Sequence, residues 1–206
     1  DNAMYSYAEE NLSRAVLLDP SLFRAYEMLG DIRLRQERRH EALAFYDRSL
    51  SENELQDRVH FKAGEIEDFF INETKALAHF VRACELNPSN VYAAAGAARV
   101  LSLQKRESEA EKYYTQSHNA GRPEEEKHLK RYAAAKKKKD YYTEEAYLAD
   151  AITANPVDSD AYFLLASVHR SRKNNGKAAA VLEKLKFMRP THEKAYVLLA
   201  HLYYSE

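Results

Sequence analysis

The chain has 206 residues, of which 45% are hydrophobic and 31% charged, and its formal net charge at pH 7 is −1. These values are typical of an ordinary soluble chain, and the sequence has no apolar run of about 18 residues, which excludes a membrane-spanning helix. Five glycines and five prolines are few for this length, as expected of a mostly helical protein.

A repeat with a constant period of about 34 residues organises the chain. Alanine recurs in the same slot of the repeat, at Ala8, Ala42, Ala76, Ala110 and Ala178. The slot four residues later holds a bulky apolar residue in every unit: Leu12, Tyr46, Phe80, Tyr114, Leu148 and Leu182. A fixed period of this length indicates one helical unit that is stacked repeatedly on itself.

Each unit carries two apolar stripes with helical spacing and a polar turn between them. In chain order, the pattern predicts a half repeat, five full repeats and a second half repeat, over residues 4–22, 23–56, 57–90, 91–124, 125–158, 159–192 and 193–206. Small residues at the eighth and twentieth positions of a unit are expected where two helices touch, and the aromatic residue four positions after the twentieth fills the adjacent gap.

The repeats are expected to form one elongated domain over residues 4–206, while residues 1–3 lie outside the pattern and are interpreted as an expression remnant. Neither end of the repeat array resembles a polar cap. We therefore expect either a fragment of a longer repeat protein or ends that pack on a second copy of the chain.

The repeat over residues 125–158 departs from the pattern, since Tyr132 and Glu144 occupy slots that hold glycine or alanine in other units. We expect a linker over residues 119–124 and a Lys-rich turn at residues 136–139. This unit is expected to introduce a bend or a softer joint.

The most regular stretches are residues 26–30 followed by Ala42 and Tyr46, and Gly64 followed by Ala76, Phe80, Ala83 and Pro88. This order of aromatic, glycine, alanine, aromatic, alanine and proline residues resembles the tetratricopeptide repeat family over nearly the whole chain. The resemblance implies an all-α, right-handed solenoid of antiparallel helix pairs. It also implies that the first helix of each pair lines a concave inner face through positions 2, 5, 9 and 12 of its unit.

Those positions supply the candidate residues of a peptide-binding groove. They are Arg24, Glu27, Asp31, Arg58, Phe61, Glu65, Tyr92, Arg99, Leu129, Lys136, Phe163, Arg170 and His201. The apolar members would anchor a partner and the arginines would supply charge, since aromatic and arginine side chains usually carry most of the energy of protein recognition. For Phe61 and Phe163, packing against the next repeat remains an open alternative.

The sequence contains no motif that indicates catalysis. The eight histidines form no His-x-x-x-His pair, and no nucleophile elbow, phosphate-binding loop or dinucleotide fingerprint occurs. Cys84, the only cysteine, is expected to be a buried thiol and not a redox centre. We therefore expect no enzyme activity, no metal and no cofactor.

The sequence thus predicts a non-catalytic scaffold that binds a peptide or protein segment of unknown identity on its concave groove. One alternative is a structural assembly protein that self-associates through its terminal helices, using a stripe formed by Tyr196, Leu199 and Tyr203. A weaker alternative is contact of the turn at residues 136–139 with an acidic segment or a nucleic acid. Nucleic acid is not favoured, because its recognition usually needs a basic face. One cysteine leaves the compartment undetermined, with a slight preference for the cytoplasm.

Overall fold

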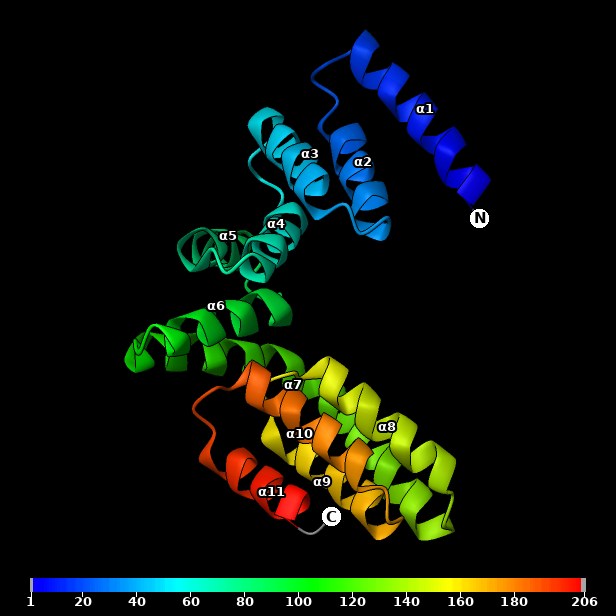
Figure 1. The fold of residues 1–206 in the computed structure, drawn as a ribbon, viewed down its shortest axis with the longest axis vertical. Helices are drawn as coiled ribbons and strands as arrows, with labels where there is room; N and C mark the ends of the chain where they lie inside the picture. Colours follow the sequence, from blue (N-terminus) through cyan, green and yellow to red (C-terminus); the bar gives the residue numbers. More distant parts are fainter. Residues whose placement is uncertain (1, 205–206) are drawn as a thin grey trace. The chain divides into compact units, whose positions relative to one another are not determined.

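The computed structural model describes residues 2–204, and this part of the chain is built from eleven α-helices without a strand (Figure 1). The helices are α1 (Asn2–Leu18), α2 (Phe23–Arg35), α3 (Arg39–Glu52), α4 (Asp57–Phe69), α5 (Glu73–Leu86), α6 (Val91–Leu103), α7 (Glu107–Lys138), α8 (Tyr141–Ala154), α9 (Ser159–Ser171), α10 (Asn175–Met188) and α11 (Glu193–Tyr204). The all-α class predicted from the repeat is confirmed. None of these helices combines the length and the apolar character of a bilayer span.

The period of the sequence persists in the helix boundaries. Second helices of a pair begin at Arg39, Glu73, Glu107, Tyr141 and Asn175, and successive starts are separated by the same repeat length. The turn before each of them contains one residue in the left-handed region, with φ between 57° and 60°, at Glu37, Ile71, Lys105, Lys139 and Lys173. The following backbone N–H then donates to the carbonyl five residues back, as from Arg38 to Arg33 at 2.9 Å, which closes the first helix with the same turn in each pair.

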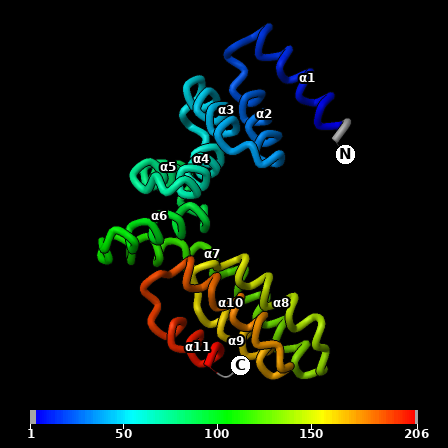
Figure 2. The backbone as a smooth tube through the Cα atoms, viewed as in Figure 1, coloured from blue at the N-terminus to red at the C-terminus, as the bar shows by residue number. Residues whose placement is uncertain are grey.

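The chain forms two compact units, one up to Asn87 and one from Pro88 onward, whose course Figure 2 shows by residue number. Unit 1 contains α1 to α5, and unit 2 contains α6 to α11. The single domain predicted for residues 4–206 stays a prediction, as does the interpretation of residues 1–3. Residue 1 lies outside the described part of the chain, and residues 2 and 3 belong to α1.

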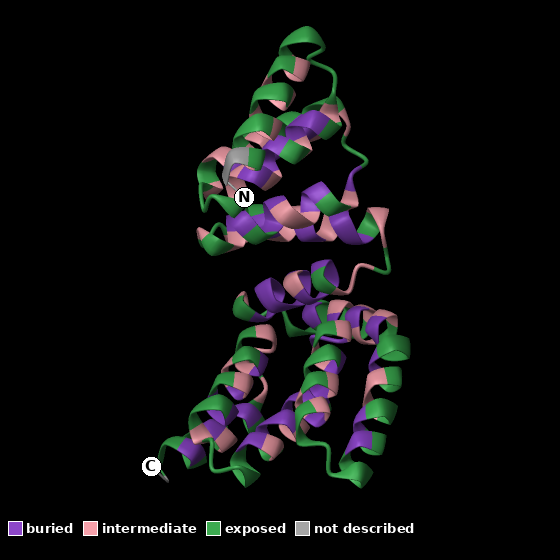
Figure 3. Ribbon diagram, turned by 90° about the vertical axis from the view of Figure 1, so that its right-hand side faces the viewer, coloured by how far each residue is buried: buried purple, intermediate pink, exposed green. Residues whose placement is uncertain are grey.

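In unit 1, an aromatic ring of α3 fills the space left by a glycine of α2, and an aromatic ring of α5 does the same for α4. A Cβ atom at Gly30 would lie 2.5 Å from the ring of Tyr46, and one at Gly64 would lie 2.8 Å from the ring of Phe80. Both rings are almost completely buried, and Figure 3 shows that the buried residues lie along the helix faces that meet. The predicted role of the small residues and of the aromatic residues is therefore confirmed for these two pairs.

Unit 2 departs from the predicted pattern because α7 runs without interruption from Glu107 to Lys138. The linker predicted over residues 119–124 is wrong, since these residues are helical and Pro123 lies inside the helix. The proline lacks the N–H that would bond to the carbonyl four residues earlier. Gly121 permits the close approach of α8, because a Cβ atom there would lie 2.3 Å from the backbone oxygen of Ala154.

Candidate partner-binding surface

In unit 1, candidate residues of two neighbouring first helices meet in a ladder of opposite charges. Glu27 and Asp31 lie one turn apart on α2, and Arg58 and Lys62 lie one turn apart on α4. The Lys62 Nζ atom lies 2.5 Å from Asp31 Oδ1 and 3.3 Å from Glu27 Oε1. The guanidinium of Arg58 lies 3.8 Å from Glu27 and 3.9 Å from Asp31. We call these four residues the charge ladder.

The two cations of the charge ladder differ in their exposure. The Lys62 side chain is 12% exposed, whereas the Arg58 side chain is 71% exposed. Asp31 also accepts a hydrogen bond of 2.7 Å from the Tyr46 hydroxyl, whose pKa is raised by burial and by this carboxylate. The acidic side of the ladder is thus held by Lys62 and Tyr46. Long contacts of an exposed arginine contribute about 0–1 kcal/mol, which leaves Arg58 able to exchange partners.

The sequence identified three of the four ladder residues and missed Lys62. That residue lies at the sixth position of the repeat over residues 57–90, outside the positions that the family resemblance assigns to the groove. Two features of the sequence could have indicated Lys62 as a ladder residue. It lies four residues after Arg58, and the preceding first helix carries an acidic pair. Of the other unit 1 candidates, Arg24 and Glu65 are exposed, while Phe61 is half-buried, with its ring centroid 6.1 Å from that of Phe80.

In unit 2, the candidate residues of α6 face other helices of the same unit. The Tyr92 hydroxyl donates a hydrogen bond of 2.6 Å to the Thr153 carbonyl at the end of α8. Arg99 is only 6% exposed, and its guanidinium carbon lies 4.5 Å from the ring centroid of Phe187 on α10. The expectation that Arg99 offers charge on an open groove is corrected here, because α10 packs over this part of α6.

The remaining candidates of unit 2 divide into packed and exposed residues. Leu129 packs with the buried Tyr132, and Phe163 of α9 packs against residues of α10 and α11, with its ring centroid 5.5 Å from that of His192. The alternative of internal packing therefore describes Phe163 in this structure. The last three candidates are exposed and lie on three different helices: Lys136 on α7, Arg170 on α9 and His201 on α11.

One group of side chains in unit 2 has the composition of a metal site, although the sequence led us to expect no metal. His118, Glu125 and Asp158 each place a ligand atom within 4.8 Å of the others. Burial raises the pKa of Glu125 to about 7, and the charge of Asp158 acts in the same direction. No signal in the sequence pointed to this group, because His118 and Asp158 belong to different repeats and the expected linker lay between His118 and Glu125.

The fold and its first-helix surface define a helical repeat protein of the class that binds other proteins. Models of the tetratricopeptide repeat match residues 23–54 and 145–193. The chain belongs to the tetratricopeptide repeat family. Members of this family generally act as scaffolds for protein–protein interaction, and this coarse role follows for the chain. No curated protein sequence matches it.

Solved structures with similar folds are also tetratricopeptide repeat proteins. One from Parabacteroides merdae is 21% identical, with a TM-score of 0.56 over 100% of this chain and 81% of its own. The pilF protein of Pseudomonas aeruginosa is 17% identical, with a TM-score of 0.55 over 97% of this chain and 91% of its own. YrrB, described as having an unusual peptide-binding site, is 17% identical, with a TM-score of 0.53 over 92% of this chain and 98% of its own. At these identities the likeness is one of fold.

Proposed function

We propose that the protein binds an extended segment of a partner protein on the face of α2 and α4 that carries the charge ladder. The observation that carries this proposal is the position of Arg58, which is largely exposed beside an acidic pair already held by Lys62. A carboxylate of the partner segment would form a charge-assisted hydrogen bond with this guanidinium. When Arg58 pairs with the partner segment, Glu27 and Asp31 would still be paired with Lys62, so no partly buried carboxylate is left without a cation.

Phe61 supplies the apolar part of the proposed surface. It lies one turn after Arg58 on α4 and is half-buried, with its ring packed near that of Phe80. An aromatic ring beside an arginine is a frequent combination at energetic centres of protein interfaces. The proposed segment therefore carries an acidic residue next to an apolar residue.

The test is selection of peptides from a random library displayed on phage, followed by affinity measurement with purified protein. The double variant Arg58→Ala/Phe61→Ala is expected to bind the selected peptides at least ~10-fold more weakly, which corresponds to about 1.4 kcal/mol. The matched control is Arg48→Ala/Phe45→Ala on α3, which removes an exposed arginine and a half-buried phenylalanine from the second helix of the same unit. Equal affinity losses in both variants, or no enrichment of any peptide, would refute the proposal.

A second candidate function is self-association through the terminal helices. On α11, Tyr196, Tyr203 and Tyr204 are 47%, 57% and 94% exposed, and on α1, Leu17 and Leu18 are each 81% exposed. The stripe expected on α11 is partly corrected, because Leu199 is 4% exposed and packs inside unit 2. Exposed apolar side chains in a group favour association.

Sedimentation at several concentrations tests this second candidate. Concentration-dependent association that is reduced by Tyr203→Glu supports it. The control is Tyr142→Glu, which places the same charge at a tyrosine that is 92% exposed on α8, which is not a terminal helix. A monomer at all concentrations, or an equal effect of both substitutions, would remove self-association as a function.

A further inference from the structure

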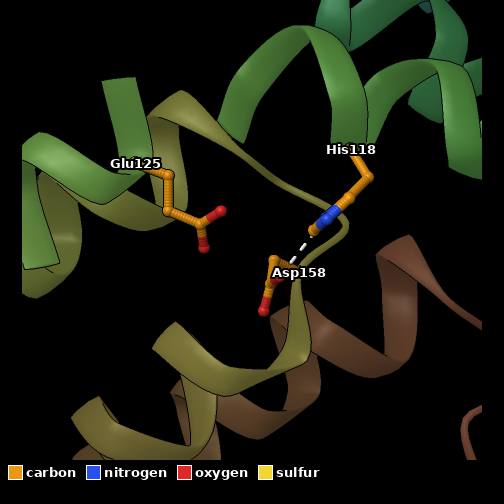
Figure 4. Close-up of side chains that lie close together, drawn as sticks. All are labelled: His118, Glu125 and Asp158. Carbon is orange, nitrogen blue, oxygen red and sulfur yellow. Dashed lines mark ion pairs between the residues drawn. The ribbon is translucent and has the colours of Figure 1, made fainter. Parts of the chain in front are cut away.

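We propose that unit 2 contains a binding site for one divalent transition-metal ion, held by His118, Glu125 and Asp158. The three side chains converge from two parts of the unit (Figure 4). His118 and Glu125 lie on α7, and Asp158 is the N-cap residue of α9. This site is independent of the surface proposed above to bind a protein segment.

The uninterrupted course of α7 brings the first two residues together. His118 and Glu125 are seven residues apart, which is about two helical turns, so they lie on the same face of a continuous helix. Both side chains extend toward Asp158 in Figure 4. A loop at residues 119–124 would not impose this common face.

Each carboxylate of the group is anchored through one oxygen. Asp158 Oδ1 accepts a hydrogen bond of 2.8 Å from the backbone N–H of Asp160, and Asp158 Oδ2 lies 3.3 Å from His118 Nδ1. Glu125 Oε2 accepts a hydrogen bond of 2.5 Å from Asn155 Nδ2. One oxygen of each acid is thus fixed by the protein while the second remains available to a cation.

The second oxygen of Glu125 is the atom of this group that most favours a bound cation. Glu125 is 3% exposed, and its Oε1 atom is buried without a hydrogen-bond partner. A buried carboxylate oxygen without a partner is costly, and a bound cation would satisfy it. The carboxylate faces the imidazole of His118 and the carboxylate of Asp158 in Figure 4.

An earlier repeat has the same hydrogen bond between an acid and an asparagine but lacks the other two side chains of the site. Asp57 and Asn87 occupy the slots of Glu125 and Asn155, and Asn87 Nδ2 donates to Asp57 Oδ2 at 2.9 Å. The pairing of an acid with an asparagine therefore occurs in both repeats. The slots that correspond to His118 and Asp158 hold leucine and asparagine in the earlier repeat, so an imidazole and a second acid join the pair in unit 2.

The donor set selects the class of ion. One imidazole nitrogen and two carboxylate oxygens suit Zn²⁺ and similar transition-metal ions, whereas Ca²⁺ and Mg²⁺ prefer oxygen ligands alone. Ligand atoms on one tetrahedral Zn²⁺ lie about 3.3 Å apart. His118 Nδ1 and Asp158 Oδ2 already have this separation, and a side-chain rotation of Glu125 closes the remaining gap from at most 4.8 Å.

The experiment is titration of the purified chain, produced without a histidine tag, with Zn²⁺ by isothermal calorimetry and with Co²⁺ by visible absorption. We expect one equivalent of Zn²⁺ to bind, and Co²⁺ to give the ligand-field spectrum of a protein site with a nitrogen ligand. Glu125→Gln, which keeps the size of the side chain, and His118→Gln should each weaken Zn²⁺ binding more than ~10-fold.

The matched control is His128→Gln. His128 lies on the same helix and pairs with Asp150 at 3.6 Å, but this pair does not belong to the three-residue group. Helicity measured by circular dichroism identifies any variant that is misfolded, and Asp158→Asn then replaces it. The proposal is overturned if Zn²⁺ binds without a defined stoichiometry, or if Glu125→Gln and His118→Gln retain wild-type affinity. It is also overturned if His128→Gln weakens Zn²⁺ binding as much as these two substitutions do.

Discussion

Substitution of Gly121 by alanine tests the close contact between α7 and α8. An alanine inside an exposed helix is usually about 1 kcal/mol more favourable than a glycine. At this position the new Cβ atom would lie 2.3 Å from the backbone oxygen of Ala154 and 3.0 Å from the Cα atom of Asn155. These are backbone atoms of the end of α8, so no rotation of a side chain relieves the overlap.

The magnitude follows from these two opposed effects. Overpacking costs about 1–3 kcal/mol, with the upper half of that range expected when backbone must shift. After the gain in helix propensity is subtracted, Gly121→Ala should lower the free energy of unfolding by about 1–2 kcal/mol. For a chain of this size, a midpoint of thermal unfolding falls by about 2–4 °C per kcal/mol.

Urea denaturation followed by circular dichroism measures the change, and amide hydrogen exchange locates it in α7 and α8. The control is Gly176→Ala near the start of α10, where a Cβ atom meets nothing within 4 Å, so this variant should equal or exceed the wild type in stability. A Gly121→Ala protein as stable as the wild type would show that α8 does not approach α7 in this way.

Three further predictions concern unit 1. Tyr46→Phe removes the hydroxyl that donates to Asp31 and should lower the free energy of unfolding by about 1 kcal/mol in urea denaturation; an unchanged midpoint would contradict the bond. Burial lowers the pKa values of His60 and His79, whose Nδ1 atoms lie 3.1 Å apart. Because the unfolded chain therefore takes up protons first, these two histidines should make unit 1 lose stability as the pH drops below about 6.5; amide hydrogen exchange in α4 and α5 that reports the same stability at about pH 7.5 and pH 5 would refute this. Burial raises the pKa of the Cys84 thiol to about 12, so a thiol reagent should label it slowly in the folded protein and rapidly after unfolding; labelling of the native protein at the rate of a free thiol would show that the site opens.

The helix pairs of unit 1 could be predicted from the sequence because their packing is local and repeated. Gly30 with Tyr46 and Gly64 with Phe80 are contacts within one helical hairpin, between positions that keep a fixed spacing in every unit. A pattern of small and aromatic residues at set offsets is sufficient to locate such contacts.

The features of unit 2 were not predictable in the same way because they depend on contacts between distant segments. Glycine and proline at positions 121 and 123 usually indicate a loop, yet the helix continues because the end of α8 packs against it. The burial of Arg99 likewise depends on Phe187, which lies several helices later in the chain. Periodicity identifies which residues face inward but does not identify the segment that covers them.

Each of the five hairpin turns contains a residue with positive φ that is not glycine. Substitution at these positions could therefore raise the free energy of unfolding. This conformation costs a side chain with a Cβ atom roughly 1–2 kcal/mol, whereas glycine adopts it freely and loses about 0.5–1 kcal/mol through its more flexible unfolded state. Ile71 bears the largest steric cost of the five because it is β-branched, and at 80% exposure it gains little from burial. Since the same geometry recurs in all five turns, an engineer could strengthen the array one hairpin at a time without replacing any residue of the charge ladder.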